Sequence, residues 1–253
     1  MKFRVLGCYG GSAPGMRPTS FLVNGRIAID AGALTDTLTI EEQSLLTHVF
    51  LSHSHMDHLC TLPFLIDNVL PVLRETIRLY GPADTVRCLK EHLFNDHLWP
   101  DFTRISNGNT TALDIETLYP GQSIRAHGVE ITAFRMEHAI SCHGHLLQEA
   151  DCSVIVCADT ASTGSLAEEL PKANGLKAVI LECSFPRSLA AIASASRHLS
   201  TDAFARESRR IPSGLPILVT HLKPGWSQAV RKELAELGLE NVSFLEQGKE
   251  YMF

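Results

Sequence analysis

Short apolar runs alternate with turn residues along the whole chain, which predicts a protein rich in β-strands. Ten runs dominated by Val, Ile, Leu and Phe are bounded by Gly, Pro, Asn or Asp, as strands commonly are. They cover residues 3–8, 20–25, 26–32, 48–54, 77–82, 129–136, 152–160, 177–185, 216–222 and 242–248. The early runs follow one another closely, as in hairpins, whereas helical stretches separate the later ones.

Three of those later stretches have helical features. Residues 201–211 and 227–238 place apolar side chains at helical spacing, and the second ends at Gly238, a suitable helix C-cap. Residues 162–173 begin with small residues that can cap a helix N-terminus. Two sheets covered by helices accommodate this order. Because no linker, repeat or low-complexity tract interrupts the chain, we expect one domain over residues 1–253.

One segment departs from the β pattern. Residues 82–105 look helical as far as Pro100 and gather Phe94, Trp99 and Phe102. Such a segment is either a packed surface helix or a lid over a pocket, and the pattern by itself favours the packed helix.

Composition narrows the class of protein. The net charge of −6 and the pI of about 6.0 argue against a basic face for nucleic acid. The seven cysteines are odd in number and form no CxxC pair, so we expect a reducing, cytoplasmic environment without a disulfide framework. No stretch approaches the roughly 20 apolar residues of a membrane span, and no signal-peptide run precedes the first glycines.

Metal-ligand side chains recur where the predicted strands end. They are His53, His55, Asp57 and His58 in "HSHMDH", His138 after 129–136, Asp159 in 152–160 and His221 in 216–222. The period of two points His53 and His55 the same way, so with His138 they could form a three-nitrogen site. Asp57, His58 and His221 could form a second site, with Asp159 between the two. Zn²⁺ is the first candidate for such ligands.

The HxHxDH spacing resembles the signature of the metallo-β-lactamase superfamily, which implies an α/β fold, an αββα four-layer sandwich. Within that superfamily, residues 181–188, 197–204 and 218–224 are similar to C-terminal motifs of class II 3′,5′-cyclic-nucleotide phosphodiesterases. Residues 90–102 resemble a further stretch of that family. The chain departs from the family at Met56, where leucine is usual, and at Arg197, where glycine is usual.

The resemblance implies a binuclear hydrolase of 3′,5′-cyclic nucleotides, cAMP or cGMP. His53, His55 and His138 would bind one ion and Asp57, His58 and His221 the other, with Asp159 bridging. The ions would be Zn²⁺ first, with Mn²⁺ or Fe as alternatives. A metal-bridging hydroxide would attack phosphorus, and the 3′ oxygen would leave to give a nucleoside 5′-monophosphate.

Further roles follow from the same resemblance. Asp57 and His198 are the residues on which catalysis would most directly depend, with His198 contacting the phosphate or protonating the leaving alkoxide. Asp30 would either orient a ligand histidine or serve a structural turn. Phe94, Trp99 and Phe102 could offer a purine a stacking surface from a lid. His145 is expected in a pocket wall or in packing.

Three other functions remain open. A ribonuclease Z-like tRNA 3′-processing endonuclease has the same metal set, but the twenty residues 139–158 leave no room for a tRNA-gripping arm between His138 and Asp159. Another ester hydrolase of the fold, arylsulfatase-like or thioesterase-like, is the second alternative, and a non-catalytic metal-binding regulator is the third. We expect a small-molecule cyclic nucleotide as partner, no stable nucleic-acid partner, no membrane, and a homodimer as in many relatives.

Overall fold

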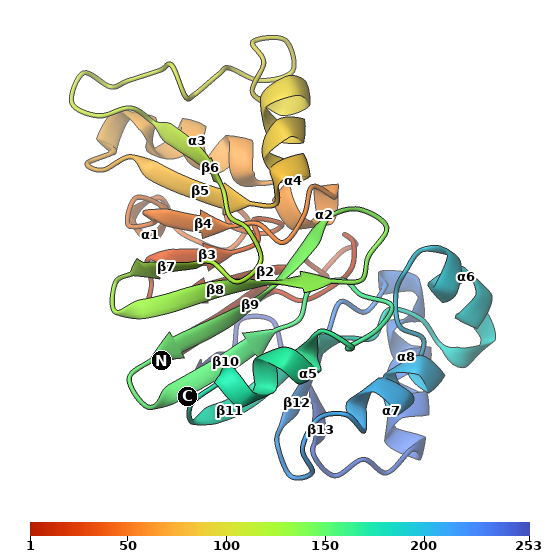
Figure 1. The fold of residues 1–253 in the computed structure, drawn as a ribbon. Helices are drawn as coiled ribbons and strands as arrows, with labels where there is room; N and C mark the ends of the chain where they lie inside the picture. Colours follow the sequence, from red (N-terminus) through yellow and green to blue (C-terminus); the bar gives the residue numbers. More distant parts are fainter.

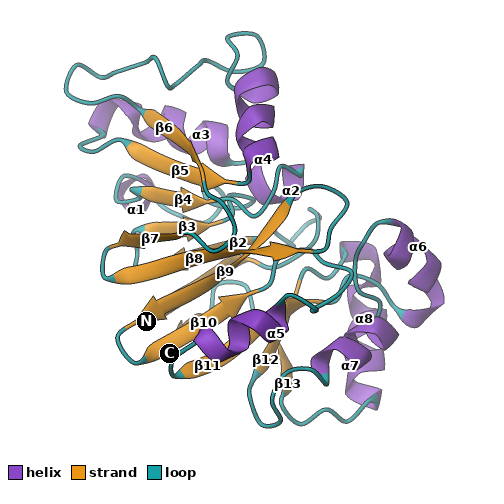
Figure 2. Ribbon diagram, in the orientation of Figure 1, coloured by secondary structure: helices purple, strands orange, loops and turns teal.

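Two β-sheets lie face to face in the computed structural model, which describes residues 1–253. Each sheet has seven strands, and helices cover the outer side of each (Figures 1 and 2). The predicted four-layer αββα sandwich is therefore confirmed. No helix combines the length and apolar character needed to cross a membrane.

The first sheet takes its strands from the first half of the chain and from the C-terminal strand. Its order is β14 (Glu250–Met252), β1 (Lys2–Gly7), β2 (Ser20–Val23), β3 (Ile27–Ile29), β4 (His48–Phe50), β5 (Ile77–Gly81) and β6 (Leu113–Thr117). The expected hairpins hold only at its start, because β1–β2–β3 are antiparallel but β3 to β6 run parallel. Helices intervene between the parallel strands, as parallel connections require.

The second sheet repeats this plan in the second half. Its order is β13 (Val242–Phe244), β12 (Ile217–Thr220), β11 (Leu176–Glu182), β10 (Cys152–Val156), β9 (Cys142–Glu149), β8 (Val129–Met136) and β7 (Ser123–Ala126). Strands β10 to β13 are parallel, and β7 to β10 form an antiparallel meander.

Helices on the two outer sides follow the same division (Figure 1). On the first sheet they are α1 (Ile40–Gln43), α2 (Met56–Leu59), α3 (Leu62–Val69) and α4 (Ala83–Cys88). On the second they are α5 (Leu166–Glu169), α6 (Ala190–Ala195), α7 (Thr201–Ser208) and α8 (Ser227–Glu236). Gly238 lies just beyond α8 with φ of +60°, which confirms the predicted C-cap.

Alternation along the strands builds three apolar layers. In β11, Ala178 and Ile180 face the other sheet, whereas Val179 and Leu181 face the helices. The central layer joins both sheets, and a layer beneath each set of helices completes the core.

Four strands escaped the sequence prediction: β6, β7, β9 and β14. Strand β9 begins with polar residues, and its Gly144 is required by close packing, since an added Cβ would lie 2.3 Å from the Phe134 ring. A glycine and two histidines within four residues hide the strand from a hydrophobic pattern.

The helix expected to reach Pro100 is shorter. After α4, a π-helical turn continues over Leu89–Leu93, and the chain then folds back so that Phe94 and Trp99 form a bridge. The backbone N–H groups of Asn95 and Asp96 both donate to the carbonyl of Trp99, which ends the helical pattern.

Candidate functional site

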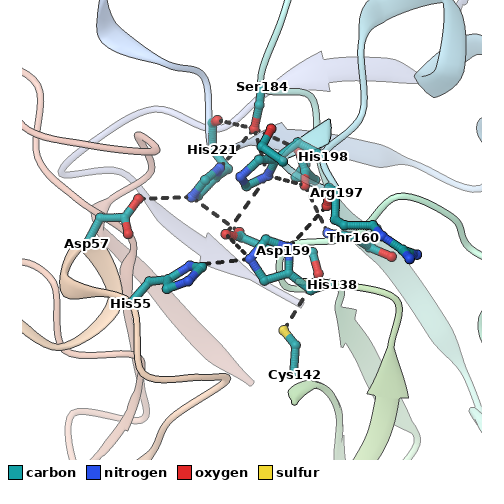
Figure 3. Close-up of polar contacts among 12 residues, drawn as sticks. His55, Asp57, His138, Cys142, Asp159, Thr160, Ser184, Arg197, His198 and His221 are labelled. Carbon is teal, nitrogen blue, oxygen red and sulfur yellow. Dashed lines mark hydrogen bonds and ion pairs between the residues drawn. The ribbon is translucent and has the colours of Figure 1, made fainter. Parts of the chain in front are cut away.

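The predicted ligand residues converge at one end of the sheets, where parallel strands finish. The segment after β4 supplies four of them, and the ends of β8, β10 and β12 supply one each. The carboxyl ends of parallel strands are the usual place for ligand sites in such sheets. The structure brings all seven together: His53, His55, Asp57, His58, His138, Asp159 and His221. Figure 3 shows five of them, His55, Asp57, His138, Asp159 and His221, pointing toward one another.

The first group joins His53, His55 and His138 to Asp159, with one ligand atom from each within 4.8 Å of the others. His138 Nε2 lies 3.3 Å from His55 Nδ1 and 3.7 Å from Asp159 Oδ2. His138 Nδ1 donates to the carbonyl of Arg197 at 3.0 Å, which leaves its Nε2 lone pair facing the group.

The second group consists of Asp57, His58 and His221. His221 Nε2 lies 3.2 Å from His58 Nε2 and 3.3 Å from Asp57 Oδ2. Both imidazoles are buried, and the Lys223 ammonium lies 3.6 Å from the same Asp57 oxygen at the rim.

Asp159 lies between the groups and turns one oxygen to each. Its Oδ2 is 3.5 Å from His53 Nε2, on the side of the first group. Its Oδ1 is 3.4 Å from His58 Nε2 and 3.2 Å from His221 Nε2, on the side of the second. The two oxygens of the Asp159 carboxylate therefore face different groups.

The donor set suits divalent cations. His53 Nε2 is buried and has no hydrogen-bond partner in the protein, although it points at Asp159. Burial lowers the pKa of His53 well below its ordinary value, so the imidazole is neutral and its lone pair is available. Burial would raise the pKa of Asp159, but the surrounding histidines, His221 and His58 first, hold it well below its ordinary value. A neutral imidazole beside an ionised carboxylate, as His53 and Asp159 provide, is the pairing that zinc-type sites require.

Asp30 supports this end of the site from behind. Its Oδ2 accepts from His58 Nδ1 at 2.7 Å, and its Oδ1 accepts from the backbone of Ser52 at 2.7 Å. Asp30 has a φ of +57°, a conformation uncommon outside glycine. The structure thus places Asp30 on His58, a predicted ligand histidine, where the sequence left this role and a turn role open.

The end of α6 places His198 in the site. The His198 backbone N–H donates to the carbonyl of Ala193 and that of Arg197 to Ser194, which is a Schellman motif. Arg197 occupies the left-handed position of this motif with a φ of +58°, which explains why the family favours glycine there. His198 Nδ1 donates to Glu182 at 2.8 Å and lies 3.9 Å from Asp159 Oδ2.

Sequence reasoning missed Glu182, Ser184, Ser52 and Lys223. Glu182 is fully buried at the end of β11, and its carboxylate raises the pKa of His198 above its ordinary value although burial opposes this. The available signal was a carboxylate directly after an apolar strand, the same signal that identified Asp159.

The structure contradicts the predicted stacking surface of Phe94, Trp99 and Phe102. Phe94 and Phe102 are only 2% and 1% exposed, and both lie in the layer beneath the helices of the first sheet. Their rings are covered by core side chains and cannot stack on a base. Trp99 is partly buried against the same layer, with its ring edge-to-face on Phe64 at 5.2 Å. His145 is buried and packs on Phe50, as expected for packing.

A cavity of about 710 Å³ opens beside the first group. Its lining includes Ser54, Arg87, Arg135, His138 and Ile140. The Ser141 hydroxyl donates to Asp84 at 2.6 Å, which ties the loop after β8 to α4 along one side.

Comparison with known proteins identifies the family of the chain. A family model described as class-II cAMP phosphodiesterases matches residues 33–249. The probable 3′,5′-cyclic-nucleotide phosphodiesterase of Yersinia pestis is 26% identical over an alignment of 270 residues, gaps included. The alignment covers 92% of this chain and 76% of that protein. Ribonuclease BN of Salmonella typhi is 30% identical over 107 residues, only 42% of this chain and 32% of that protein.

Solved structures show the same fold. Unliganded yeast PDE1 has a TM-score of 0.81 at 19% identity, with 98% of each chain covered. The metallo-β-lactamase fold protein YhfI of Bacillus subtilis has a TM-score of 0.77 at 22% identity, with 99% of each chain covered. The family model spans most of the sequence and includes every residue of both ligand groups, and the chain therefore belongs to the class-II cAMP phosphodiesterase family of metal-dependent hydrolases.

Proposed function

We propose that this chain hydrolyses 3′,5′-cyclic nucleotides, both cAMP and cGMP, to nucleoside 5′-monophosphates at a centre of two divalent ions. The observation that carries the proposal is the orientation of Asp159, which turns one oxygen to each of two ligand groups. A carboxylate shared between two ions is a recurring arrangement in enzymes that cleave phosphate esters.

The two groups divide the ligands. His53, His55 and His138 would hold one ion, and the second group would hold the other, with Asp159 shared. Zinc is the ion we propose, because the combined ligand set has five imidazoles and only two carboxylates. When bound, two such ions activate a shared water at neutral pH and neutralise the charge of the phosphoryl group.

His198 supplies the proton in this proposal. Its Nδ1–H is held by the Glu182 carboxylate at 2.8 Å, which leaves Nε2 as the nitrogen that can serve the substrate. The 3′ alkoxide is a poor leaving group, and protonation by a positioned imidazole makes its departure easier. Lys223, at the rim, would add a positive charge near the phosphate.

The cavity beside the first group is the place we propose for the nucleoside. It shares His138 with the ligand set, so a phosphate at the centre would lie next to this cavity. Arg87 and Arg135 offer hydrogen-bond donors to base or ribose acceptors, and Ile140 offers an apolar contact.

Ribonuclease activity is the weaker candidate. The shared stretch with Ribonuclease BN covers less than half of the chain. Most of the segment between His138 and Asp159 is taken up by the β9–β10 hairpin, whose turn contains only residues 150–151. No protruding arm is built there to grip a folded RNA.

A single substrate panel tests the proposal. Purified protein loaded with Zn²⁺ or Mn²⁺ is offered cAMP, cGMP, bis-p-nitrophenyl phosphate and a tRNA precursor. We expect turnover of both cyclic nucleotides, with nucleoside 5′-monophosphate as product. Turnover of the tRNA precursor alone would contradict the proposal.

The Asp57→Ala variant tests the metal centre. We expect it to lose about one of two bound metal equivalents and more than about a hundredfold in kcat/KM, since weaker perturbations of outer contacts already cost 10–100-fold. Asp67→Ala, at an exposed aspartate of α3, is the matched control. Full activity and full metal content in Asp57→Ala would exclude the assigned ligand set.

Three broader expectations stay predictions. We propose that residues 1–253 form one domain, because the central apolar layer takes side chains from both sheets. A homodimer in solution and a cytoplasmic location are tested by light scattering and by cell fractionation.

A further inference from the structure

Two buried serines, Ser52 and Ser184, each contact a buried carboxylate and a histidine of the site. Ser52 follows β4, and its hydroxyl donates to Asp30 Oδ2 at 2.9 Å. The Ser52 Oγ also lies 3.0 Å from His53 Nδ1. The serine thus stands between a buried carboxylate and a histidine of the first group.

The second serine is Ser184, just beyond β11. Its hydroxyl lies 2.7 Å from Glu182 Oε2 and 3.0 Å from His221 Nδ1. Glu182 uses its other oxygen, Oε1, for His198, whereas Asp30 uses the same oxygen, Oδ2, for both Ser52 and His58. Each carboxylate therefore holds one imidazole directly and reaches a second imidazole through a serine.

The direction of these hydrogen bonds follows from the number of protons. A serine hydroxyl has one proton, and a carboxylate at 2.7–2.9 Å is a stronger acceptor for it than the His221 carbonyl at 3.1 Å. With that proton committed, the serine oxygen can only accept, so the facing Nδ1 must carry a hydrogen. The Nε2 lone pairs of His53 and His221 are then fixed toward Asp159.

Other partners of these nitrogens are weaker. The Cys142 thiol lies 3.7 Å from His53 Nδ1, a long contact to a weak partner. Ser52 also approaches His58 Nδ1 at 3.2 Å, but the Asp30 carboxylate is closer to that nitrogen.

We propose that Ser52 and Ser184 are positioning residues, one for each metal group, which fix the tautomer and the direction of His53 and His221. This inference rests on the proposed metal ligands. Outer contacts of this kind typically change metal affinity by 10–100-fold, so each serine would set the affinity of its own group.

The test compares Zn²⁺ affinities by chelator competition in Ser52→Ala, Ser184→Ala and the control Ser153→Ala. Ser153 is also buried and donates to the carbonyl of Asn174, far from the site, so it matches the loss of a buried hydroxyl. We expect one of two Zn²⁺ equivalents to weaken by about 10–100-fold in each site variant and neither in the control.

The Asp57→Ala background assigns each serine to its group. There the second group is already impaired, so Ser52→Ala should weaken the remaining Zn²⁺ further, whereas Ser184→Ala should change it little.

Replacement by Thr or Val isolates the hydroxyl, because the two side chains have nearly the same shape. We expect Ser184→Thr to bind Zn²⁺ more tightly than Ser184→Val, and nitrogen NMR of His221 to show the Nδ1–H tautomer only where the hydroxyl remains. Equal affinities in the Thr and Val variants, or Ala variants indistinguishable from Ser153→Ala, would overturn the inference while the metal sites stand. A wild-type protein that binds no Zn²⁺ would overturn the proposed function itself.

Discussion

The choice of substrate can separate the proposed proton-donor role of His198 from any effect on folding and metal binding. Protonation matters for an alkoxide leaving group and little for p-nitrophenolate, which leaves readily without a proton. We expect His198→Ala to lower kcat for cAMP by about 10²–10⁴-fold, the usual contribution of a general acid. The loss with bis-p-nitrophenyl phosphate should be much smaller. An equal loss with both substrates would assign His198 to the phosphate contact instead.

Gly10 illustrates how the site depends on a residue that binds nothing. A Cβ at this position would lie 2.5 Å from Cε1 and Nδ1 of His221, so any side chain displaces that imidazole. We expect Gly10→Ala to weaken metal binding by at least about tenfold, the low end for perturbed outer contacts. Gly225→Ala is the control, since its Cβ would meet nothing within 4 Å. Unchanged metal affinity in Gly10→Ala would show that His221 tolerates the shift.

At the scale of elements, the segment after α4 packs in the core and does not form a binding surface for the substrate. We expect Phe102→Ala to lower the free energy of unfolding by about 3–5 kcal/mol, the usual loss for a buried phenylalanine, because its ring is 1% exposed. The KM for cAMP should remain unchanged in the folded fraction. Urea unfolding measures the first effect, with Leu98→Ala, at a 64% exposed position, as the control. A raised KM without loss of stability in Phe102→Ala would support the hypothesis that this ring stacks on the purine.

The elements show what a sequence can reveal about this site. His53, His55, Asp57 and His58 were identifiable because they lie within one turn after one strand. The later ligands were identifiable because each follows an apolar run. All of them were placed by local pattern together with the family resemblance.

The outer contacts depend on adjacency that no local pattern contains. Ser184 meets His221 because β11 and β12 pair in parallel and finish at the same edge. The direction of an aromatic ring is equally hidden, since Phe94 and Phe102 turn inward only once α3 and the first sheet are in place.

At the scale of the whole molecule, a histidine between the sheets makes stability depend on pH. Burial lowers the pKa of His145 from 6.5 to about 3, and its ring packs on Phe50 of the opposite sheet. Below pH 6.5 the unfolded chain binds a proton at this position that the folded protein excludes until about pH 3. The free energy of unfolding therefore decreases as the pH is lowered across this interval, by up to about 1.4 kcal/mol per pH unit.

Replacement of that histidine measures the effect. His145→Phe should show a shallower loss of stability between pH 6.5 and pH 4.5 than the wild type, as followed by urea unfolding in metal-free buffer. His92→Phe, at an exposed position, should keep the wild-type slope. Parallel slopes for wild type and His145→Phe would mean that other groups dominate acid unfolding.

The left-handed backbone of Arg197 lowers the stability of this protein. Its side chain is exposed, its φ of +58° suits glycine, and its contribution to the site is a backbone carbonyl that glycine also has. Arg197→Gly should therefore raise the melting temperature, with relief of roughly 1 kcal/mol or more of backbone strain, while kcat/KM stays the same. Lost activity would instead reveal a substrate contact of the guanidinium. The His221 and Asp30 backbones are left-handed too, but their side chains are needed, so selection can relax the backbone only at the position whose side chain is free to change.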